Sequence, residues 1–312
     1  MHIVASLTAA TLTIASTPLA AASQAGNPTI VVKATPLDPD QARQRAVEFV
    51  KRTGVAHGQQ QVARWVVPVC IKVIGLTTPQ AVMVEDLMLD VAYEAKMPVA
   101  RPGCKPNVTV TFAPDAGQVV GHIYARKPSQ FGELSRAERE LLLNGDAPVR
   151  WWYATQMVDR EGVESNSISA PWVTAGEGSV GTVVSLPTAD GVSATQQYNS
   201  GSNVRTPTVR SLYGATVVVD AGKVGKTPVD ALAAYAAMVA FAEMNAAAPP
   251  PDSILGLFQP DSVESSLTDW DMAFLKSLYR MPLDRRSRIQ RGHLVEALLD
   301  ERLPDKSAKK KP

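Results

Sequence analysis

Four acidic residues are the first candidates for chemistry in this sequence: Asp220, Asp230, Glu243 and Asp271. They flank apolar segments that we expect to be helices, and two carboxylates that face one cleft can act as general acid and general base. Asp230 and Asp271 each stand three residues after a threonine, which is the spacing of a helix cap. A structural role is therefore favoured, and Asp220 and Glu243 are kept only as weak candidates.

The histidines and cysteines do not form a recognisable metal site. His57, His122 and His293 fall on separate predicted elements without the spacing of metal ligands. Neither a second C-x-x-C nor a nearby His joins Cys70 and Cys104 to complete four zinc ligands. A G-x-S-x-G elbow, a Walker loop and a G-x-G-x-x-G fingerprint are also absent from the sequence. We expect no metal and no cofactor, and we lean toward a protein that is not an enzyme.

Three adjacent aromatic residues, Trp151, Trp152 and Tyr153, are weak candidates for binding. They lie in a predicted strand, where successive side chains point to opposite faces. One ring is then expected in the core and another on an exposed face, and exposed aromatic rings suit contacts with sugar or peptide. Packing in the core, or cover by a long loop, is the favoured alternative.

The first 22 residues have the composition of a secretory signal peptide. They contain no Lys, Arg, Asp or Glu, and Ala20 and Ala22 satisfy the A-x-A rule for cleavage after Ala22. A basic N-terminal region is missing, with only His2 in its place, which leaves an apolar leader as the alternative. No cysteine stands near the cleavage site, which argues against a lipoprotein. We expect a periplasmic or secreted protein.

Export favours a disulfide between Cys70 and Cys104, because a pair of cysteines tends to be oxidised outside the cytoplasm. The bond would close a loop of about 35 residues, for which chain entropy predicts a stabilisation of about 3 to 4 kcal/mol. Two buried thiols are the alternative.

Composition and charge describe a folded protein. The chain has 312 residues, of which 45% are apolar and 20% are charged, with a formal net charge of +1. This charge balance excludes a charge-driven nucleic-acid binder, and beyond the N-terminus no apolar run is long enough to span a membrane. We expect a signal peptide at 1–22, an N-terminal segment at 23–60, a single domain at 61–303 with a long loop at 160–206, and a disordered basic tail at 304–312.

Periodicity predicts an α+β domain with a mixed, twisted sheet of about four strands. The predicted strands are 64–73, 107–112, 149–158 and 209–220, and the predicted helices are 39–53, 78–97, 135–143, 228–245, 269–280 and 287–302. The helix at 228–245 is apolar almost all round, which is typical of a helix buried in the middle of a domain.

The order of these elements, from about residue 64 to 280, resembles the zincin-like metallopeptidase architecture. The strand 215–220 precedes the central helix, and 235–243 is the part of that helix where the family carries its metal-binding motif. The segment 267–279, LTDWDMAFLKSLY, looks like the L-T-x-x-D-x-x-x-L-x-x-L-Y stretch of secreted, zincin-like bacterial proteins of uncharacterised function.

The sequence departs from that family at the metal site. Zinc chemistry there needs H-E-x-x-H, with two imidazoles to hold the metal and a glutamate to activate its water. In the matching register, Tyr235 and Val239 take the two ligand positions and Ala236 takes that of the catalytic glutamate.

The resemblance therefore implies a pseudoenzyme: an exported zincin-like scaffold that has lost its metal site and acts by binding an envelope protein or polymer. A hydrolase with an unrecognised carboxylate or metal site is one alternative. A structural envelope protein that contacts a partner through its loop or exposed aromatics is the other.

Overall fold

The computed structural model describes residues 38–55, 60–158, 185–187, 193–195, 206, 208–245, 248–260 and 262–303. All of them belong to one compact unit, which begins at Asp38. The predicted signal peptide, His57, the predicted tail and most of the loop at 160–206 lie outside the described residues. Within that loop, β5 (Ser185–Pro187) and β6 (Ser193–Thr195) pair antiparallel.

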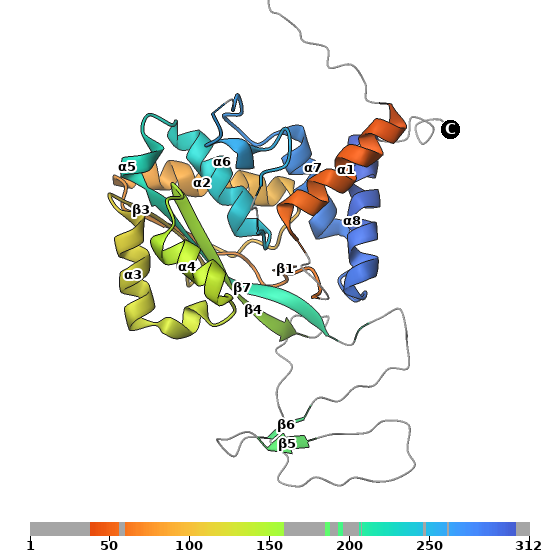
Figure 1. Ribbon diagram of the computed structural model, residues 1–312, viewed down its shortest axis with the longest axis horizontal. Helices are drawn as coiled ribbons and strands as arrows, with labels where there is room; N and C mark the ends of the chain where they lie inside the picture. The colour runs from red at the N-terminus through yellow and green to blue at the C-terminus, as the bar shows by residue number, and fades with distance from the viewer. Residues whose placement is uncertain are drawn as a thin grey trace, which may run out of the picture. The chain divides into compact units, whose positions relative to one another are not determined.

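A mixed five-stranded sheet forms the centre of this unit (Figure 1). Three strands run parallel in the order β2 (Ile71–Ile74), β3 (Val108–Ala113) and β7 (Val209–Asp220). The fourth, β4 (Val149–Val158), pairs antiparallel with the other side of β7. The short β1 (Arg64–Trp65) pairs with the beginning of β7. A mixed sheet with helices agrees with the predicted α+β class.

The single strand predicted at 64–73 is wrong, because the chain divides there into β1 and β2. Since β3 lies between β2 and β7, the chain pairs with β7 at Arg64 and Trp65 and then moves over to pair with β3 at Ile71. Pro68 lies in the interval and has no N–H to donate to a ladder.

Helices cover both faces of the sheet. One face carries α2 (Thr78–Glu94), which connects the parallel strands β2 and β3, together with α6 (Val229–Phe241). The other face carries α3 (Ala116–Arg126), η1 (Pro128–Phe131) and α4 (Arg136–Asn144), as Figure 1 shows. The helix α3 was not predicted from the sequence; Asp115 caps it by accepting from Gln118 N. The S-x-x-E pattern of Ser135 and Glu138 predicts a capping box at the start of the helix expected at 135–143, and this capping box is present on α4.

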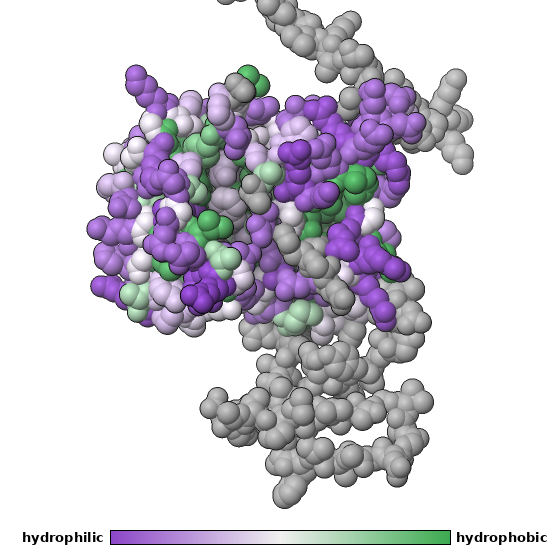
Figure 2. Space-filling model, viewed as in Figure 1, coloured by the Kyte–Doolittle hydropathy of each residue, from purple (hydrophilic) through white to green (hydrophobic). Residues whose placement is uncertain are grey.

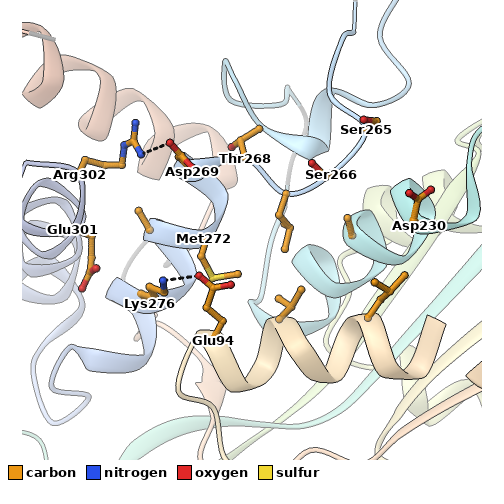
Figure 3. Close-up of a pocket in the computed structure, with 15 residues that line it drawn as sticks. Glu94, Asp230, Ser265, Ser266, Thr268, Asp269, Met272, Lys276, Glu301 and Arg302 are labelled. Atoms are coloured by element: carbon orange, nitrogen blue, oxygen red, sulfur yellow. Dashed lines mark hydrogen bonds and ion pairs between the residues drawn. The ribbon is translucent and has the colours of Figure 1, made fainter. Parts of the chain in front are cut away.

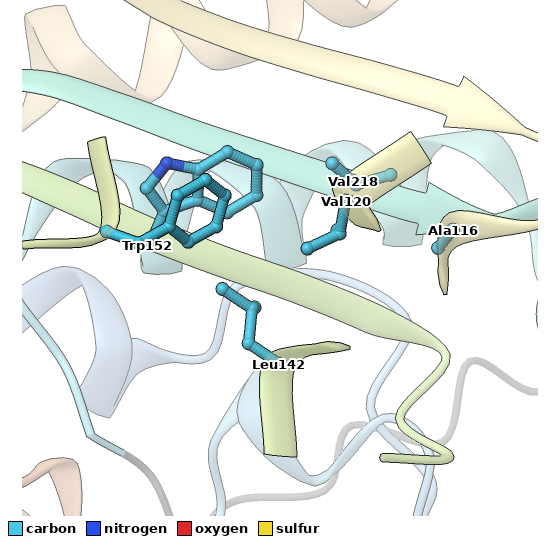
Figure 4. Close-up of a cluster of buried hydrophobic side chains, with 6 residues drawn as sticks. Ala116, Val120, Leu142, Trp152 and Val218 are labelled. Atoms are coloured by element: carbon cyan, nitrogen blue, oxygen red, sulfur yellow. The ribbon is translucent and has the colours of Figure 1, made fainter. Parts of the chain in front are cut away.

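A cluster of buried side chains joins the sheet to α3 and α4 (Figure 4). Trp152 on β4 stacks on Phe131, with ring centroids 4.9 Å apart. Val218 on β7, Val120 on α3 and Leu142 on α4 complete its surroundings. For Trp152, packing in the core is therefore the correct interpretation.

The central helix α6 is buried along most of its length, with ten of its thirteen residues inaccessible. It ends at Phe241 and not at residue 245, because Ala242 adopts an extended conformation. The predicted cap is wrong as well: Thr227 donates its hydroxyl to the carbonyl of Val224, and Asp230 accepts only from the adjacent N–H of Ala231. A short helix, α5 (Ala221–Val224), precedes it and is capped by Asp220.

The remaining helices pack beside this layer. They are α1 (Pro39–Thr53), η2 (Ile254–Gly256), α7 (Asp269–Arg280) and α8 (Ser287–Arg302). The predicted capping box of Thr268 and Asp271 is present at the start of α7. In the part of the chain that the structure describes, none of the helices has the length and apolar character needed to cross a bilayer.

A disulfide joins Cys70, at the start of β2, to Cys104 in the turn before β3, with Cα atoms 6.1 Å apart. Asn107 supports the same junction: its side chain accepts from Cys70 N at 2.7 Å and donates to Pro68 O at 3.0 Å.

Candidate functional site

A cleft of about 960 Å³ runs along strand β4, and we call it the β4 cleft. One wall is formed by α4 and the segment before it, and the other by the residues that follow α6. On the face shown in Figure 2, hydrophobic surface gathers over the region of α4 and β4. Its lining residues are Gly54, Gln60, Glu133, Leu134, Glu138, Leu141, Leu142, Ala147, Val149, Arg150, Trp151, Trp152, Tyr153, Thr155, Arg210, Glu243, Met244 and Asn245.

The backbone of β4 presents a free edge to this cleft. In an antiparallel pair, alternate residues direct their N–H and C=O groups toward the partner strand, and the intervening residues direct theirs away. Asp220 N on β7 donates to Pro148 O at 2.9 Å, so the backbone groups of every second residue from Pro148 onward point toward β7. Val149, Trp151, Tyr153 and Thr155 therefore direct their backbone groups away from β7. Among the described residues, no strand pairs with β4 on that side.

The free edge is blocked at Thr155. Its backbone N–H donates to Glu133 Oε1 at 2.6 Å, and its hydroxyl donates to Glu133 Oε2 at the same distance. Native proteins commonly limit an exposed sheet edge by placing a charged side chain on it. Among the described residues, the part of this edge that is neither paired nor blocked is the segment from Val149 to Tyr153, in which Val149 and Tyr153 are buried and Trp151 is partly buried.

A second set of charges lies beside this end of the strand. Arg210 on β7 donates to both carboxylate oxygens of Glu243, one of them at 2.7 Å, and its side chain is only 13% exposed. The same guanidinium reaches Glu133 Oε2 at 3.4 Å. Arg210 thus links Glu243, in the segment after α6, with Glu133, which blocks the edge of β4.

The two walls also touch farther along the cleft. Asn245 Nδ2 donates to Glu138 Oε1 at 3.0 Å, which links the segment after α6 to α4. Beside this contact the wall is apolar, because Leu141 on α4 is 69% exposed. The cleft therefore offers a backbone edge with which no described strand pairs, an exposed apolar side chain on one wall and several carboxylates.

Two aromatic side chains of β4 form the floor toward α6. Trp151 is partly buried, donates from Nε1 to Met244 O at 3.3 Å and packs edge-on against Tyr235. The Tyr153 hydroxyl lies 2.6 Å from Val239 O and 2.9 Å from Ala242 O, and it accepts from Met244 N. Burial raises the pKa of Tyr153 well above its ordinary value, so this hydroxyl is neutral at physiological pH and serves as a structural contact.

Glu133 and Arg210 both line this site, but they were not predicted from the sequence. No spacing in the sequence connects them with Thr155 or Glu243, which are 22 and 33 positions away from them. Two signals in the sequence pointed to the cleft: the aromatic run, all three residues of which line it, and the candidate carboxylate Glu243, which lines it as well.

The two carboxylate candidates, Asp220 and Glu243, make different contacts. Glu243 lines the β4 cleft in its ion pair with Arg210. Asp220 is buried outside that lining and accepts from Ala116 N at 3.0 Å and from Lys223 N at 3.2 Å, so it caps two helix starts. The other capping carboxylate, Asp271, is buried and accepts from Ser253 Oγ and Ile254 N. Burial raises the pKa of Asp271.

The positions that would carry a zinc motif are inside the protein. Tyr235, Ala236 and Val239 are all buried in α6, and burial raises the pKa of Tyr235. His122 lies on α3 and His293 on α8. Within the described ranges, His, Cys, Asp and Glu side chains do not gather in groups of three or more that would hold a metal ion.

A second pocket, of about 580 Å³, lies among α2, α6, α7 and α8 (Figure 3). Its charged side chains are largely paired across the pocket: Lys276 binds Glu94 at 2.7 Å and Arg302 binds Asp269 at 3.0 Å. These ion pairs connect neighbouring helices, and the pocket has no open backbone edge comparable with that of β4. The β4 cleft is therefore the stronger candidate site.

No protein-family model matches this chain, and no curated protein or solved structure is significantly similar to it.

Proposed function

We propose that this protein is an exported, non-catalytic binding protein that holds an extended peptide segment of an envelope partner in the β4 cleft. The observation that carries the proposal is the free edge of β4, whose backbone groups at Val149, Trp151 and Tyr153 face a cleft of about 960 Å³. The peptide would add to the sheet as a further strand beside β4.

Strand addition fits the chemistry of this edge. Main-chain hydrogen bonds supply affinity in this mode of recognition, and pockets for alternate side chains supply specificity. The exposed Leu141 on one wall and the partly buried Trp151 in the floor provide apolar surface for such side chains. The edge is short, because Glu133 already occupies the N–H of Thr155.

The absence of catalysis rests on the residues of α6. The zincin-like resemblance would place the metal on that helix, where Tyr235, Ala236 and Val239 occupy the positions of two ligands and a base. The antiparallel edge strand and the buried α6 after β7 support this resemblance, and we retain it as part of the proposal. The remaining carboxylate in the cleft, Glu243, is held by Arg210.

The location in the cell envelope rests on two observations. The N-terminal 22 residues have the composition of a secretory signal. The disulfide between Cys70 and Cys104 is of a kind that persists in oxidising compartments.

The proposal is tested by selecting ligands from a library of random nonapeptides on the full-length chain exported to a bacterial periplasm and purified from there. Each selected peptide is then resynthesised with one backbone N-methyl group at each position in turn. Because alternate residues of an added strand pair with β4, we expect methylation to weaken binding about five-fold or more at every second residue and little between them. The peptides should be recovered uncleaved.

Matched variants locate the binding site. Leu141→Asp places a charge on the cleft wall and should abolish binding, whereas Val263→Asp, at an 88% exposed position outside the cleft lining, should leave it unchanged. Failure to select any peptide, an N-methyl scan without a two-residue period, or equal effects of the two variants would overturn the proposed function.

A further inference from the structure

We propose that the peptide bound in the β4 cleft carries an ammonium or guanidinium group at the end that reaches Thr155, and that Glu133 binds this cation. The inference rests on the proposed function and names the chemistry of its ligand.

The position of the cation follows from the blocked edge. A peptide paired with Trp151 and Tyr153 would next meet Thr155, whose N–H already donates to Glu133 at 2.6 Å. The ladder cannot continue there without displacing a carboxylate, so the added strand ends or turns away at that point. Its last paired residue is then beside the Glu133 side chain.

The sign of the charge follows from the neighbouring ion pairs. Arg210 makes two hydrogen bonds with Glu243 and only one long contact, 3.4 Å, with Glu133. Two carboxylates thus share one guanidinium, and Glu133 is the more exposed of the two, at 41% against 24%. One negative charge is left at the end of the edge.

The other cation in the lining does not neutralise this charge. Arg150 is buried and donates to the carbonyls at the end of α4: Leu142 and Leu143 at 3.0 Å and Gly145 at 2.5 Å. The cleft therefore attracts a cation and repels an anion.

Glu133 keeps the capacity to bind such a group. A carboxylate offers about four acceptor sites; Thr155 uses two of them, and Arg210 makes a long contact with a third. A hydrogen bond between a carboxylate and a charged nitrogen is about twice as strong as one between neutral groups. A lysine or arginine side chain and the free amino terminus of a peptide each supply a positively charged nitrogen that donates hydrogen bonds to a carboxylate.

The experiment uses peptides selected on the wild-type chain and compares each one with two derivatives. Acetylation removes the charge of the amino terminus, and replacement of lysine or arginine by norleucine removes that of the side chain. We expect one of the two changes to weaken binding about three- to ten-fold, and the change that does so identifies the source of the cation.

Glu133→Gln is the decisive variant, because glutamine keeps the length of the side chain and still accepts from Thr155 N. In this variant the charged and neutral peptides should bind equally, whereas Glu264→Gln, outside the cleft lining, should preserve the wild-type difference. The inference is overturned if removing the cation has no effect on wild-type binding, or if its effect is the same in Glu133→Gln.

These results separate the two proposals. A two-residue period in the N-methyl scan without any effect of peptide charge would overturn this inference and leave strand addition in place. Absence of that period, or of any selected peptide, would overturn both.

Discussion

Trp152 and Tyr153 are neighbours in the sequence and have different functions in the structure. Trp152 packs beneath α3 and α4, whereas Tyr153 points to the opposite face and binds the carbonyls at the end of α6. The last carbonyl groups of a helix have no partners within the helix. The Tyr153 hydroxyl shares its one proton between the carbonyls of Val239 and Ala242, and its oxygen accepts from the N–H of Met244. One phenol thereby holds the floor of the β4 cleft to the central helix.

Tyr153→Phe tests this contribution. Removing the hydroxyl leaves buried carbonyls and an N–H without their partner, so the free energy of unfolding should fall by about 1 to 3 kcal/mol. Equilibrium urea denaturation followed by tryptophan fluorescence measures the change. The control is Tyr213→Phe, at a 46% exposed position on β7, which should change stability by less than about 0.5 kcal/mol. An equal loss in both variants would show that the buried hydroxyl contributes nothing specific.

The parallel strands β2 and β3 are held together where they begin, by a disulfide and by the side chain of Asn107. Both begin close to the disulfide, and Asn107 adds two hydrogen bonds to the chain around Cys70. The connection between the strands includes α2, since parallel strands need a long crossover. The covalent bond closes the loop that contains β2 and α2, with a sequence separation of 34 between the two cysteines.

Replacing both cysteines, Cys70→Ser with Cys104→Ser, should lower the free energy of unfolding by about 3 to 4 kcal/mol, because the open loop restores entropy to the unfolded chain. Urea denaturation with and without dithiothreitol provides the measurement. The reductant should destabilise the wild-type chain by a similar amount and have no effect on the double variant. A wild-type chain insensitive to complete reduction would contradict the prediction.

At the scale of the whole molecule, the first described helix packs against the last two. Phe49 on α1 is fully buried, with ring centroids 6.1 Å from Trp270 and 5.6 Å from Phe274 on α7. On the exposed side, Arg43 of α1 binds Glu296 of α8 at 2.6 Å. Residues more than 200 positions apart therefore form one helical layer beside the sheet.

Phe49→Ala should lower the free energy of unfolding by about 3 to 5 kcal/mol, because it removes a large buried ring and leaves a cavity against α7. Val47→Ala on the same helix is the matched control; its side chain is 47% exposed, and its effect should stay within about 0.5 kcal/mol. Denaturant titration followed by circular dichroism compares the two. A small loss for Phe49→Ala would mean that α1 docks on the rest of the unit only weakly.

Elements with strong local signals could be predicted from the sequence alone. Alternation predicted the bounds of β4 and β7, and the capping boxes at Ser135 and Thr268 predicted the starts of α4 and α7. These signals are local, because a strand alternates every two residues and a cap binds an N–H three positions away. α3 was missed, and the end of α6 was placed too late, at residue 245.

The edge position of β4 and the residues beside it depend on the tertiary fold and could not be predicted from the sequence. The order β2–β3–β7–β4 leaves one side of β4 open, and this order depends on pairings between distant segments. The same topology brings Glu133 to Thr155 and Arg210 to Glu243. Contacts of this kind leave no periodic signal in the chain, because each depends on the packing of several elements and not on the spacing of residues within one.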